Sequence, residues 1–190
     1  MRGVKLNSKK KIHPFSTTCL ILGIALMAFG AGWYVMEIIQ DYAVEQENEK
    51  IIDAIQTEAI ENSNQTLDSA SIGENEYIGI IEIPSISLKM PVLSTCEGGN
   101  LDKGICLYYR DKSIVIGGHN RTSQFRSLYA LKGNDLLYFY DLSMNKKEYK
   151  LIGTEFLMPN EVEKFVTDEY SVTLFTCDWG DERRFVLRFQ

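Results

Sequence analysis

An uncharged stretch near the amino end constrains the fold of this chain more than any other feature. Residues 14–36, PFSTTCLILGIALMAFGAGWYVM, form 23 consecutive positions without an acidic or basic side chain. This length matches the roughly 20 apolar residues that an α-helix needs to cross about 30 Å of hydrocarbon. Trp33 and Tyr34 stand near its end, where interfacial aromatic residues gather. We therefore predict a transmembrane signal-anchor helix over residues 16–39.

The charges on the two sides of this stretch are unequal. Residues 1–15 carry five basic side chains and no acid, whereas residues 40–76 carry ten acids and a single lysine. Basic flanks stay in the cytoplasm, so we expect residues 1–15 to be a cytoplasmic tail and the rest to be extracellular. The alternative is a cleaved signal peptide with AFGAG as its small-residue site, although the apolar run exceeds the usual 7–15 residues or so. Both interpretations export the remainder, and the net charge of −6 gives no reason to expect a nucleic-acid partner.

Residues 40–76 are interpreted as an acidic extracytoplasmic stalk or linker. Apolar residues at positions 51, 52, 55, 59 and 60 form a weak helical stripe on a polar segment, and ENSNQTLDSASIGENE follows as a flexible connection. A solvated spacer between membrane and domain is our preferred interpretation. A self-associating helix is the alternative.

Residues 77–190 have the pattern of a small, mostly β domain. Strand-like runs flank Pro84 and the SMNK turn at 143–146, and others occur in SIVIGGH, SVTLFTC and RFVLRF. SQFRSLYAL (123–131) predicts one short amphipathic helix that begins at Ser123, and residues 159–170 predict a loop with one helical turn. Short strands without alternating long helices favour a mostly antiparallel sheet or a small barrel.

Two strand ends in this domain present residues suited to acyl transfer. His119 follows IVIGG, Cys177 follows VTLFT, and the only other histidine, His13, would lie on the cytoplasmic side of the span. A thiolate is a good acyl nucleophile, imidazole transfers protons, and an arginine stabilises an oxyanion. Gly117 and Gly118, without side chains, would let another backbone or a peptide approach closely. From spacing alone, Cys177 also suits a small buried core residue, and His119 a structural hydrogen-bonding group.

The other cysteines leave one question open. Cys19 lies in the apolar stretch, whereas Cys96, Cys106 and Cys177 lie in the exported part, and three is an odd number. A disulfide between Cys96 and Cys106 and two unpaired thiols are both compatible with the sequence. There is no CxxC motif and only one external histidine, so a metal site has little support.

Four segments in order resemble one known family. The first is TLFTC (173–177), which resembles the TLxTC signature of sortases, the Gram-positive cell-surface transpeptidases. The histidine segment and the arginine strand of that family resemble VIGGHN (115–120) and RFVL (184–187). The paired opening strands of the family resemble IGIIEIPSISLKMPVL (78–93). The resemblance covers residues 77–190. It implies an eight-stranded sortase-like β-barrel with one or two short helices, preceded here by the transmembrane helix.

The resemblance also implies a reaction. Cys177 would attack the threonine carbonyl of an LPxTG-like sorting signal at the C-terminus of a secreted protein, forming a thioacyl-enzyme. An amine from a peptidoglycan precursor or a pilin lysine would then resolve this intermediate, with His119 transferring the protons and no metal or organic cofactor required. Because no second apolar span follows and no long lid segment precedes these strands, the resemblance favours protein anchoring to peptidoglycan over pilin polymerisation.

Two arginines compete for the third catalytic position. Strand alternation puts Arg184, Val186 and Arg188 on one face and Arg183 on the other, so only one of the two neighbours can face the cysteine. Arg184 directly precedes FVL, as the family's arginine precedes an apolar triplet. We therefore predict Arg184 as the catalytic residue and Arg183 as an exposed charge.

Four neighbours are supporting candidates with two interpretations each. Asn120 either holds the histidine loop through the backbone or contacts substrate, and Thr176 is either structural or helps to position substrate. Asp178 either stabilises the turn or accepts a hydrogen bond from Arg184. Trp179 either lines the cleft or packs over the barrel end.

Three other functions remain as alternatives. A catalytically silent sortase-like barrel would bind a peptide or partner, and a plain cysteine peptidase would release its product to water. An L,D-transpeptidase also combines cysteine, histidine and arginine, but TLFTCDW lacks the Ser-His-Gly type of neighbour.

Overall fold

The first hairpin of the domain follows from the sequence around Pro84. In the computed structural model, β2 (Asn75–Ile83) and β3 (Leu88–Leu93) pair antiparallel on either side of a 3₁₀ turn, η1 (Pro84–Ile86). Proline fixes its own φ near the value such a turn requires. Ser87 closes the turn with φ 52°, and its N–H donates to the carbonyl of Pro84 at 3.1 Å. The predicted tight connection between two strands is confirmed.

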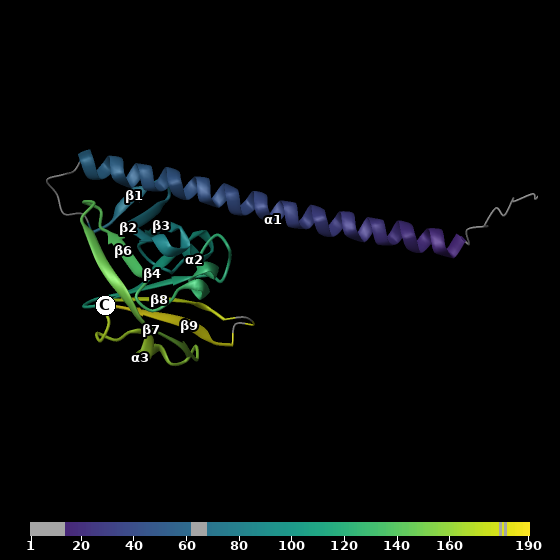
Figure 1. The fold of residues 1–190 in the computed structure, drawn as a ribbon. Helices are drawn as coiled ribbons and strands as arrows, with labels where there is room; N and C mark the ends of the chain where they lie inside the picture. The colour runs from purple at the N-terminus through teal and green to yellow at the C-terminus, as the bar shows by residue number, and fades with distance from the viewer. Residues whose placement is uncertain (1–13, 62–67, 179, 181) are drawn as a thin grey trace, which may run out of the picture. The chain divides into compact units, whose positions relative to one another are not determined.

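The structure describes residues 14–61, 68–178, 180 and 182–190, and the chain divides into two units, Met1–Asp41 and Tyr42–Gln190. The second unit contains every strand (Figure 1). Its remaining elements are β1 (Ala70–Ile72), α2 (Asn100–Lys103), β4 (Cys106–Arg110), β5 (Ile114–Gly118), η2 (Arg126–Ala130), β6 (Leu136–Tyr140), β7 (Lys146–Leu157), α3 (Val162–Phe165), β8 (Val172–Cys177) and β9 (Arg184–Phe189).

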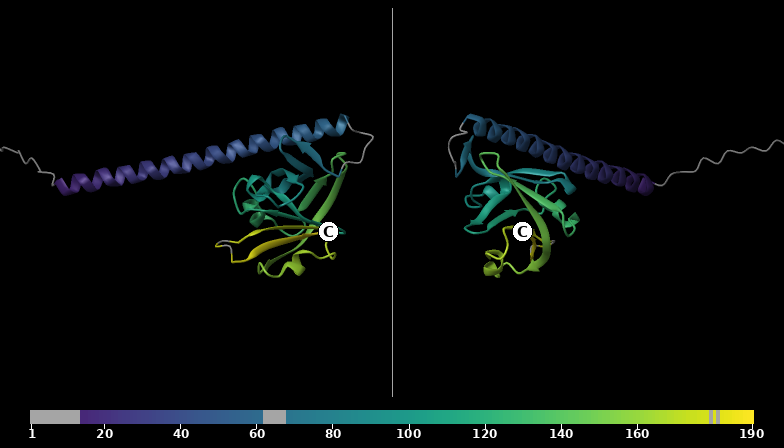
Figure 2. Two further views of the ribbon diagram at one scale, coloured as in Figure 1. Left: turned by 180° about the vertical axis from the view of Figure 1, so that it is seen from behind. Right: turned by 60° about the vertical axis from the view of Figure 1, so that its left-hand side comes forward.

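The strands close into the predicted eight-stranded barrel. They are ordered β2-β3-β4-β5-β8-β9-β7-β6, and β6 pairs back onto β2, while the short β1 extends the sheet beside β2. All pairs are antiparallel except β3 with β4 and β5 with β8. Figure 2 shows this wrapped sheet from two further sides. The parallel pair β5–β8 brings the predicted histidine and cysteine strands side by side.

Alternate residues of these strands fill the barrel. Ile116 of β5, Leu174 of β8 and Leu187 of β9 are all 0% exposed and belong to one core cluster. Because side chains alternate across a strand, the residues between them point to the outer face of the sheet. The strand-face assignment therefore decides which polar residues can meet outside the barrel.

The helix predicted from Ser123 is instead the 3₁₀ segment η2. Phe125, just before it, is fully buried, and its N–H donates to the carbonyl of His119 at 3.1 Å. Tertiary contacts at the barrel end thus favour this 3₁₀ backbone over the regular hydrogen bonding of the predicted α-helix. The single turn predicted within 159–170 is present as α3.

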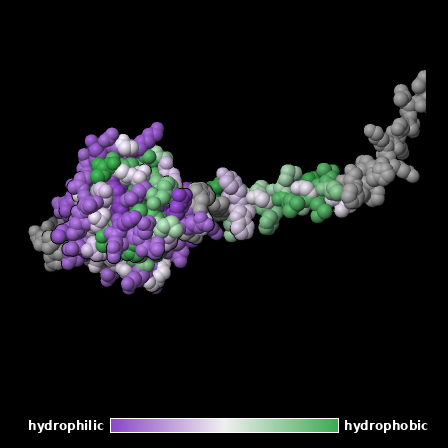
Figure 3. All heavy atoms as spheres, turned by 90° about the horizontal axis from the view of Figure 1, so that it is seen from below, coloured by the Kyte–Doolittle hydropathy of each residue, from purple (hydrophilic) through white to green (hydrophobic). Residues whose placement is uncertain are grey.

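The described part of the first unit is the beginning of α1 (Pro14–Glu61). Its large apolar side chains are exposed, and the helix is long and apolar enough to cross a membrane. Figure 3 shows this apolar stretch along the helix. A helix that is apolar all round and has no protein partner suits a lipid environment. Most of the predicted basic tail, residues 1–15, lies outside the described residues.

The end of α1 differs from the solvated stalk predicted over 40–76. Within the second unit, Ile52 and Ile55 are 5% and 1% exposed and pack in a cluster with Ala70, Tyr77 and Leu93. Both β1 and the start of β2 also fall inside the predicted stalk. The weak stripe at 51, 52 and 55 is therefore the buried side of a helix that packs against the sheet.

Candidate active site

Three strand ends bring the predicted catalytic residues into one row. In the parallel pair β5–β8, Gly117 lies opposite Phe175 and Gly118 opposite Thr176, so the next residue, His119, reaches the level of Cys177. In the antiparallel pair β8–β9, Cys177 lies directly opposite Arg184. Opposed residues of an antiparallel pair have Cβ atoms about 4.5–5.5 Å apart. The order across the sheet is thus His119, Cys177, Arg184.

All three residues lie on the outer face of the barrel. Leu174 and Phe185 belong to the interior cluster, so Cys177 and Arg184, an odd number of positions away along their strands, point outward. Ile116 also belongs to that cluster, and His119 directly follows β5, so the same alternation continued one residue past the strand places His119 on the outer side. The Cys177 thiol takes no part in a disulfide. The predicted nucleophile, the predicted acid–base group and the arginine therefore share one surface.

Arg183 makes its contacts on the other side of the hairpin. Its guanidinium donates to a carboxylate oxygen of Asp178 at 2.7 Å and lies 4.6 Å from the centre of the Phe156 ring. The N–H of Asp178 also donates to the carbonyl of Arg183 at 2.8 Å. Asp178 thus stabilises the β8–β9 turn, as one of its two interpretations predicted. The guanidinium of Arg184 donates to the carbonyl of Arg183 at 3.4 Å.

Tyr129 joins this turn to the barrel core. Its hydroxyl donates to the second carboxylate oxygen of Asp178 at 3.2 Å, and its ring stacks on Phe185 with centroids 4.4 Å apart. Burial, and then the negative charge of Asp178, raise the pKa of Tyr129 to about 12. The phenol therefore stays protonated at neutral pH and keeps its role as a donor beside the cysteine.

His119 has contacts that the sequence did not predict. Its ring Nε2 lies 3.2 Å from a carboxylate oxygen of Asp102 on α2, and its ring is 27% exposed. Its backbone N–H donates to the side-chain oxygen of Gln124 at 2.6 Å. Gln124 is itself buried and donates to the carbonyl of Leu101 at 3.2 Å. The histidine is thus held from both its backbone and its ring.

The two glycines before His119 have a different role from the predicted one. A Cβ on Gly117 would lie 2.8 Å from the Phe175 ring, and a Cβ on Gly118 would lie 2.6 Å from the Phe125 ring. Both glycines therefore make room for aromatic side chains of this chain. Side-chain rings, in place of the predicted second backbone or peptide, lie next to these two glycines.

The remaining predicted support residues have no contact that defines a role with substrate. Thr176 is fully buried, and among the described residues its hydroxyl has no hydrogen-bond partner. The carbonyl of Asn120 accepts a hydrogen bond from Arg126 at 3.3 Å, a backbone contact of the predicted kind, while its side-chain oxygen is buried and unpartnered within the described part of the chain. Trp179 lies outside the described residues.

A buried arginine secures the loop between β7 and β8. Arg188 is 4% exposed and donates to Glu155 at 2.8 Å and to the Thr173 hydroxyl at 2.9 Å. It also donates to the carbonyls of Lys164 and Phe165, which belong to α3. Arg188 shares the outer face with Arg184, so this loop is fixed on the surface that carries the row.

A separate cavity of about 430 Å³ lies between the end of α1, β2, β3 and α2. Its lining includes Tyr77, Leu93 and Asp102 but none of the three row residues. Nothing in it resembles a nucleophile with its base. Among the described residues, no three His, Cys, Asp or Glu side chains group as a metal site would.

Comparison with known proteins identifies the family. The model of the sortase domain matches residues 81–189, which is more than half of the chain. The chain belongs to the sortase family. The resemblance read from four short motifs is therefore confirmed, and the predicted barrel is the fold that this family shares.

Individual sortases are similar over different lengths. Sortase A of Bacillus anthracis is 32% identical over 120 residues, which is 57% of this chain and 56% of that protein, so the match spans little more than half of the relative. The X-ray structure of sortase C from Clostridium perfringens SM101 is 26% identical, with 76% of this chain and 88% of that chain covered and a TM-score of 0.53. The structure of Clostridium perfringens sortase C with the C-terminal cell wall sorting motif is 23% identical, with 81% of this chain and 97% of that chain covered and a TM-score of 0.54. This likeness shows the fold alone.

Asp102, Gln124, Tyr129 and Arg188 are the site contacts that sequence reasoning missed. Each contacts an element distant in sequence, so no local pattern marks it. Arg188 offered the strongest signal, because strand alternation already placed it on the face of Arg184.

Proposed function

We propose that this sortase is a membrane-anchored cysteine transpeptidase. The observation that carries the proposal is the row His119, Cys177, Arg184 on one outer face at the ends of β5, β8 and β9. In this proposal, all three residues act on one peptide bond.

In the first half-reaction, the Cys177 thiolate attacks the scissile carbonyl carbon and a tetrahedral oxyanion forms. Arg184 lies directly opposite Cys177, so its guanidinium donates to that oxyanion. His119 gives a proton to the nitrogen of the leaving segment, and the C–N bond breaks. The product is a thioester between Cys177 and the carboxyl part of the substrate.

In the second half-reaction, an amine attacks the thioester carbonyl. His119 accepts the proton of the amine, a new amide forms, and Cys177 leaves as a thiolate. The same histidine thus acts as acid and then as base.

The substrate class is part of the proposal. We infer that the donor is a secreted protein with a C-terminal LPxTG-like sorting signal and that the acceptor is a cell-wall amine, such as that of a peptidoglycan precursor. Membership of the sortase family supports this choice. A Clostridium perfringens sortase C of the same fold was solved with a C-terminal cell wall sorting motif, which supports this substrate class.

We also propose that the apolar part of α1 anchors the enzyme, with the amino end in the cytoplasm and the barrel outside. The exposed apolar surface of this helix supports membrane insertion. The basic residues before it support the orientation.

The test is cleavage of a fluorogenic library of LPxTG-like peptides by the full chain in detergent. We expect turnover, a trapped thioacyl-enzyme at Cys177 seen by mass spectrometry, and a new amide product when an amine is added. Cys177→Ala should fold normally and lose turnover. Absence of turnover together with an unreactive Cys177 thiol would instead favour a silent binding barrel.

Two further results separate the alternatives. If added amines leave the product unchanged, the enzyme is a plain cysteine peptidase. Arg184→Ala should reduce kcat/KM much more than Arg183→Ala, because Arg183 is engaged with Asp178 across the turn. The opposite ranking would overturn the assignment of Arg184.

A further inference from the structure

The segment between Cys96 and Cys106 places an acidic side chain against His119. Asp102, on the one-turn helix α2, lies with a carboxylate oxygen 3.2 Å from Nε2 of the histidine ring. The same oxygen lies 3.4 Å from the guanidinium of Arg121. Asp102 is 70% exposed, so this contact is on the surface rather than within a sealed pocket. A mobile carboxylate would contribute little there.

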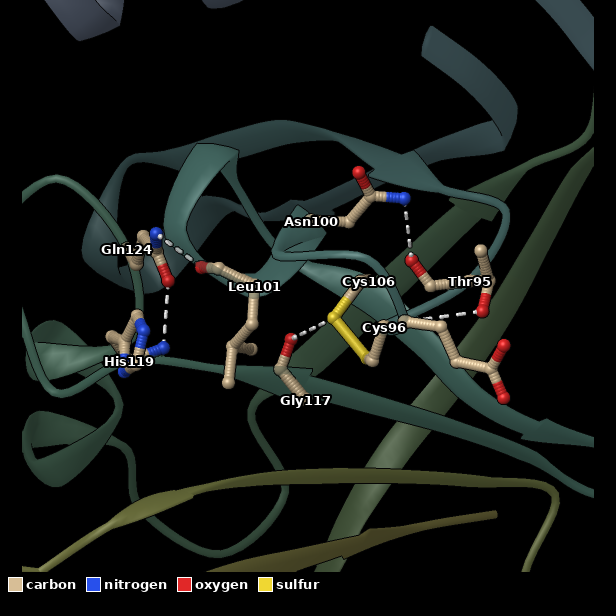
Figure 4. Close-up of a disulfide and its surroundings, with 9 residues drawn as sticks. Thr95, Cys96, Asn100, Leu101, Cys106, Gly117, His119 and Gln124 are labelled. Atoms are coloured by element: carbon tan, nitrogen blue, oxygen red, sulfur yellow. Dashed lines mark hydrogen bonds between the residues drawn. A yellow bond between two sulfur atoms is a disulfide. The ribbon is translucent and has the colours of Figure 1, made fainter.

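Two connections fix the position of α2 beside the histidine. Gln124 is 4% exposed and joins the backbone N–H of His119 to the carbonyl of Leu101, the neighbour of Asp102 (Figure 4). A disulfide joins Cys96 to Cys106 across the base of the segment, and Cys106 lies opposite Gly117 on the histidine strand β5. The segment is therefore tied to the histidine strand from two sides, and its carboxylate is held where the ring can reach it.

We propose that Asp102 is a positioning residue for His119. It accepts a hydrogen bond from Nε2–H and so fixes the orientation of the imidazole. Nε2 is then occupied, which leaves Nδ1 as the ring atom that exchanges the proton with the leaving and incoming amines. This inference rests on the proposed function for the identity of those amines, but the contact itself does not depend on it.

A positioning role predicts a specific kinetic signature. The carboxylate lies next to the histidine ring, on α2, and is not part of the row itself, so its loss should leave peptide binding nearly unchanged. Proton transfer in both half-reactions requires the correct ring orientation, so kcat should fall for each. Asp102 is exposed but held in place through α2, so we assign it the net contribution of one ordinary hydrogen bond, which corresponds to a loss of about fivefold to tenfold.

The kinetic experiment compares three variants of the full chain in detergent. Asp102→Ala should lower kcat about fivefold to tenfold with KM changed by less than about twofold. Asp102→Asn keeps an acceptor oxygen and should remain within about threefold of the parent kcat. Asp111→Ala is the matched control, because Asp111 is an exposed aspartate outside this segment. It should leave both parameters unchanged.

A second readout is independent of turnover. The chain has two histidines, so His13→Gln leaves His119 as the only source of imidazole signals. In this background we expect Asp102→Ala, but not Asp111→Ala, to move the ring ¹⁵N resonances of His119. Asp102→Asn should move them less than Asp102→Ala does.

The outcomes separate this inference from the proposed function. Unmoved ring resonances in Asp102→Ala would refute the contact, and an unchanged kcat in an active enzyme would refute the positioning role. A loss expressed in KM alone would also overturn it, because it would indicate substrate binding. If no peptide is turned over by the parent chain, the proposed function fails, while the resonance test still decides whether Asp102 orients His119.

Discussion

Replacement of Ile55 by alanine tests whether the end of α1 is part of the folded domain. Ile55 is 1% exposed and packs in the cluster that includes Tyr77 and Leu93. The change removes three carbon atoms from this contact, at about 0.8 kcal/mol each, and the cavity left behind adds to that loss. Alanine favours the helix by a few tenths of a kcal/mol or so. We therefore expect a net destabilisation of about 3 kcal/mol.

Ile60 is the matched control, because it belongs to the same helix and is 77% exposed. Ile60→Ala makes the same chemical change without loss of burial, so its effect should stay within about 0.5 kcal/mol. In thermal unfolding followed by circular dichroism, about 3 kcal/mol corresponds to a fall in Tm of roughly 9 °C for a domain of this size. Equal melting temperatures for the two variants would show that residues 42–61 are a solvated spacer after all.

Three other perturbations probe the supports of the site. Replacing Cys96 and Cys106 together by alanine opens a loop of ten-residue separation, so the free energy of unfolding measured in guanidinium chloride should fall by about 2–3 kcal/mol; no change would contradict the disulfide. Arg188→Met leaves the loop carbonyls and Glu155 without their buried donor, so limited proteolysis between β7 and β8 should become faster, and an unchanged cleavage rate would refute the clamp. The raised pKa of Tyr129 means that the folded state keeps a phenol proton that the unfolded state loses above pH 10, so stability should decline as the pH rises from about 10 to 12. Tyr129→Phe should weaken that decline in pH-dependent melting curves, and an identical decline would contradict the assignment.

The row itself could be predicted because its signals are local. His119 and Cys177 each end an apolar strand, and alternation restricts the arginine to one of two neighbours. The choice between Arg183 and Arg184 depends on the register of β8 against β9. That register pairs Cys177 with Arg184 and Asp178 with the backbone of Arg183. Sequence alone gives the alternation but not the pairing.

The segment predicted as a stalk, residues 40–76, illustrates a different limit of prediction from sequence. A solvated acidic spacer and a helix that packs through one narrow side have almost the same composition. Ile52 and Ile55 are the only buried side chains in the described part of α1, and the surface they meet comes from Ala70, Tyr77 and Leu93. Those partners are brought together by the pairing of β1 with β2 and of β2 with β3. The stripe was visible in the sequence, but its partner surface was not.

The cysteines connect the fold to the chemistry most directly. The three cysteines that follow α1 left the pairing open, and the disulfide between Cys96 and Cys106 resolves it without involving Cys177. The remaining thiol lies on the outer face beside a histidine and an arginine, where a cysteine kept only for packing would not be expected. The disulfide in turn spans the segment that carries Asp102 to the histidine. All three cysteines therefore serve the same site. Cys177 is the proposed nucleophile, and the pair Cys96–Cys106 supports the segment that contacts its proposed acid–base partner, His119.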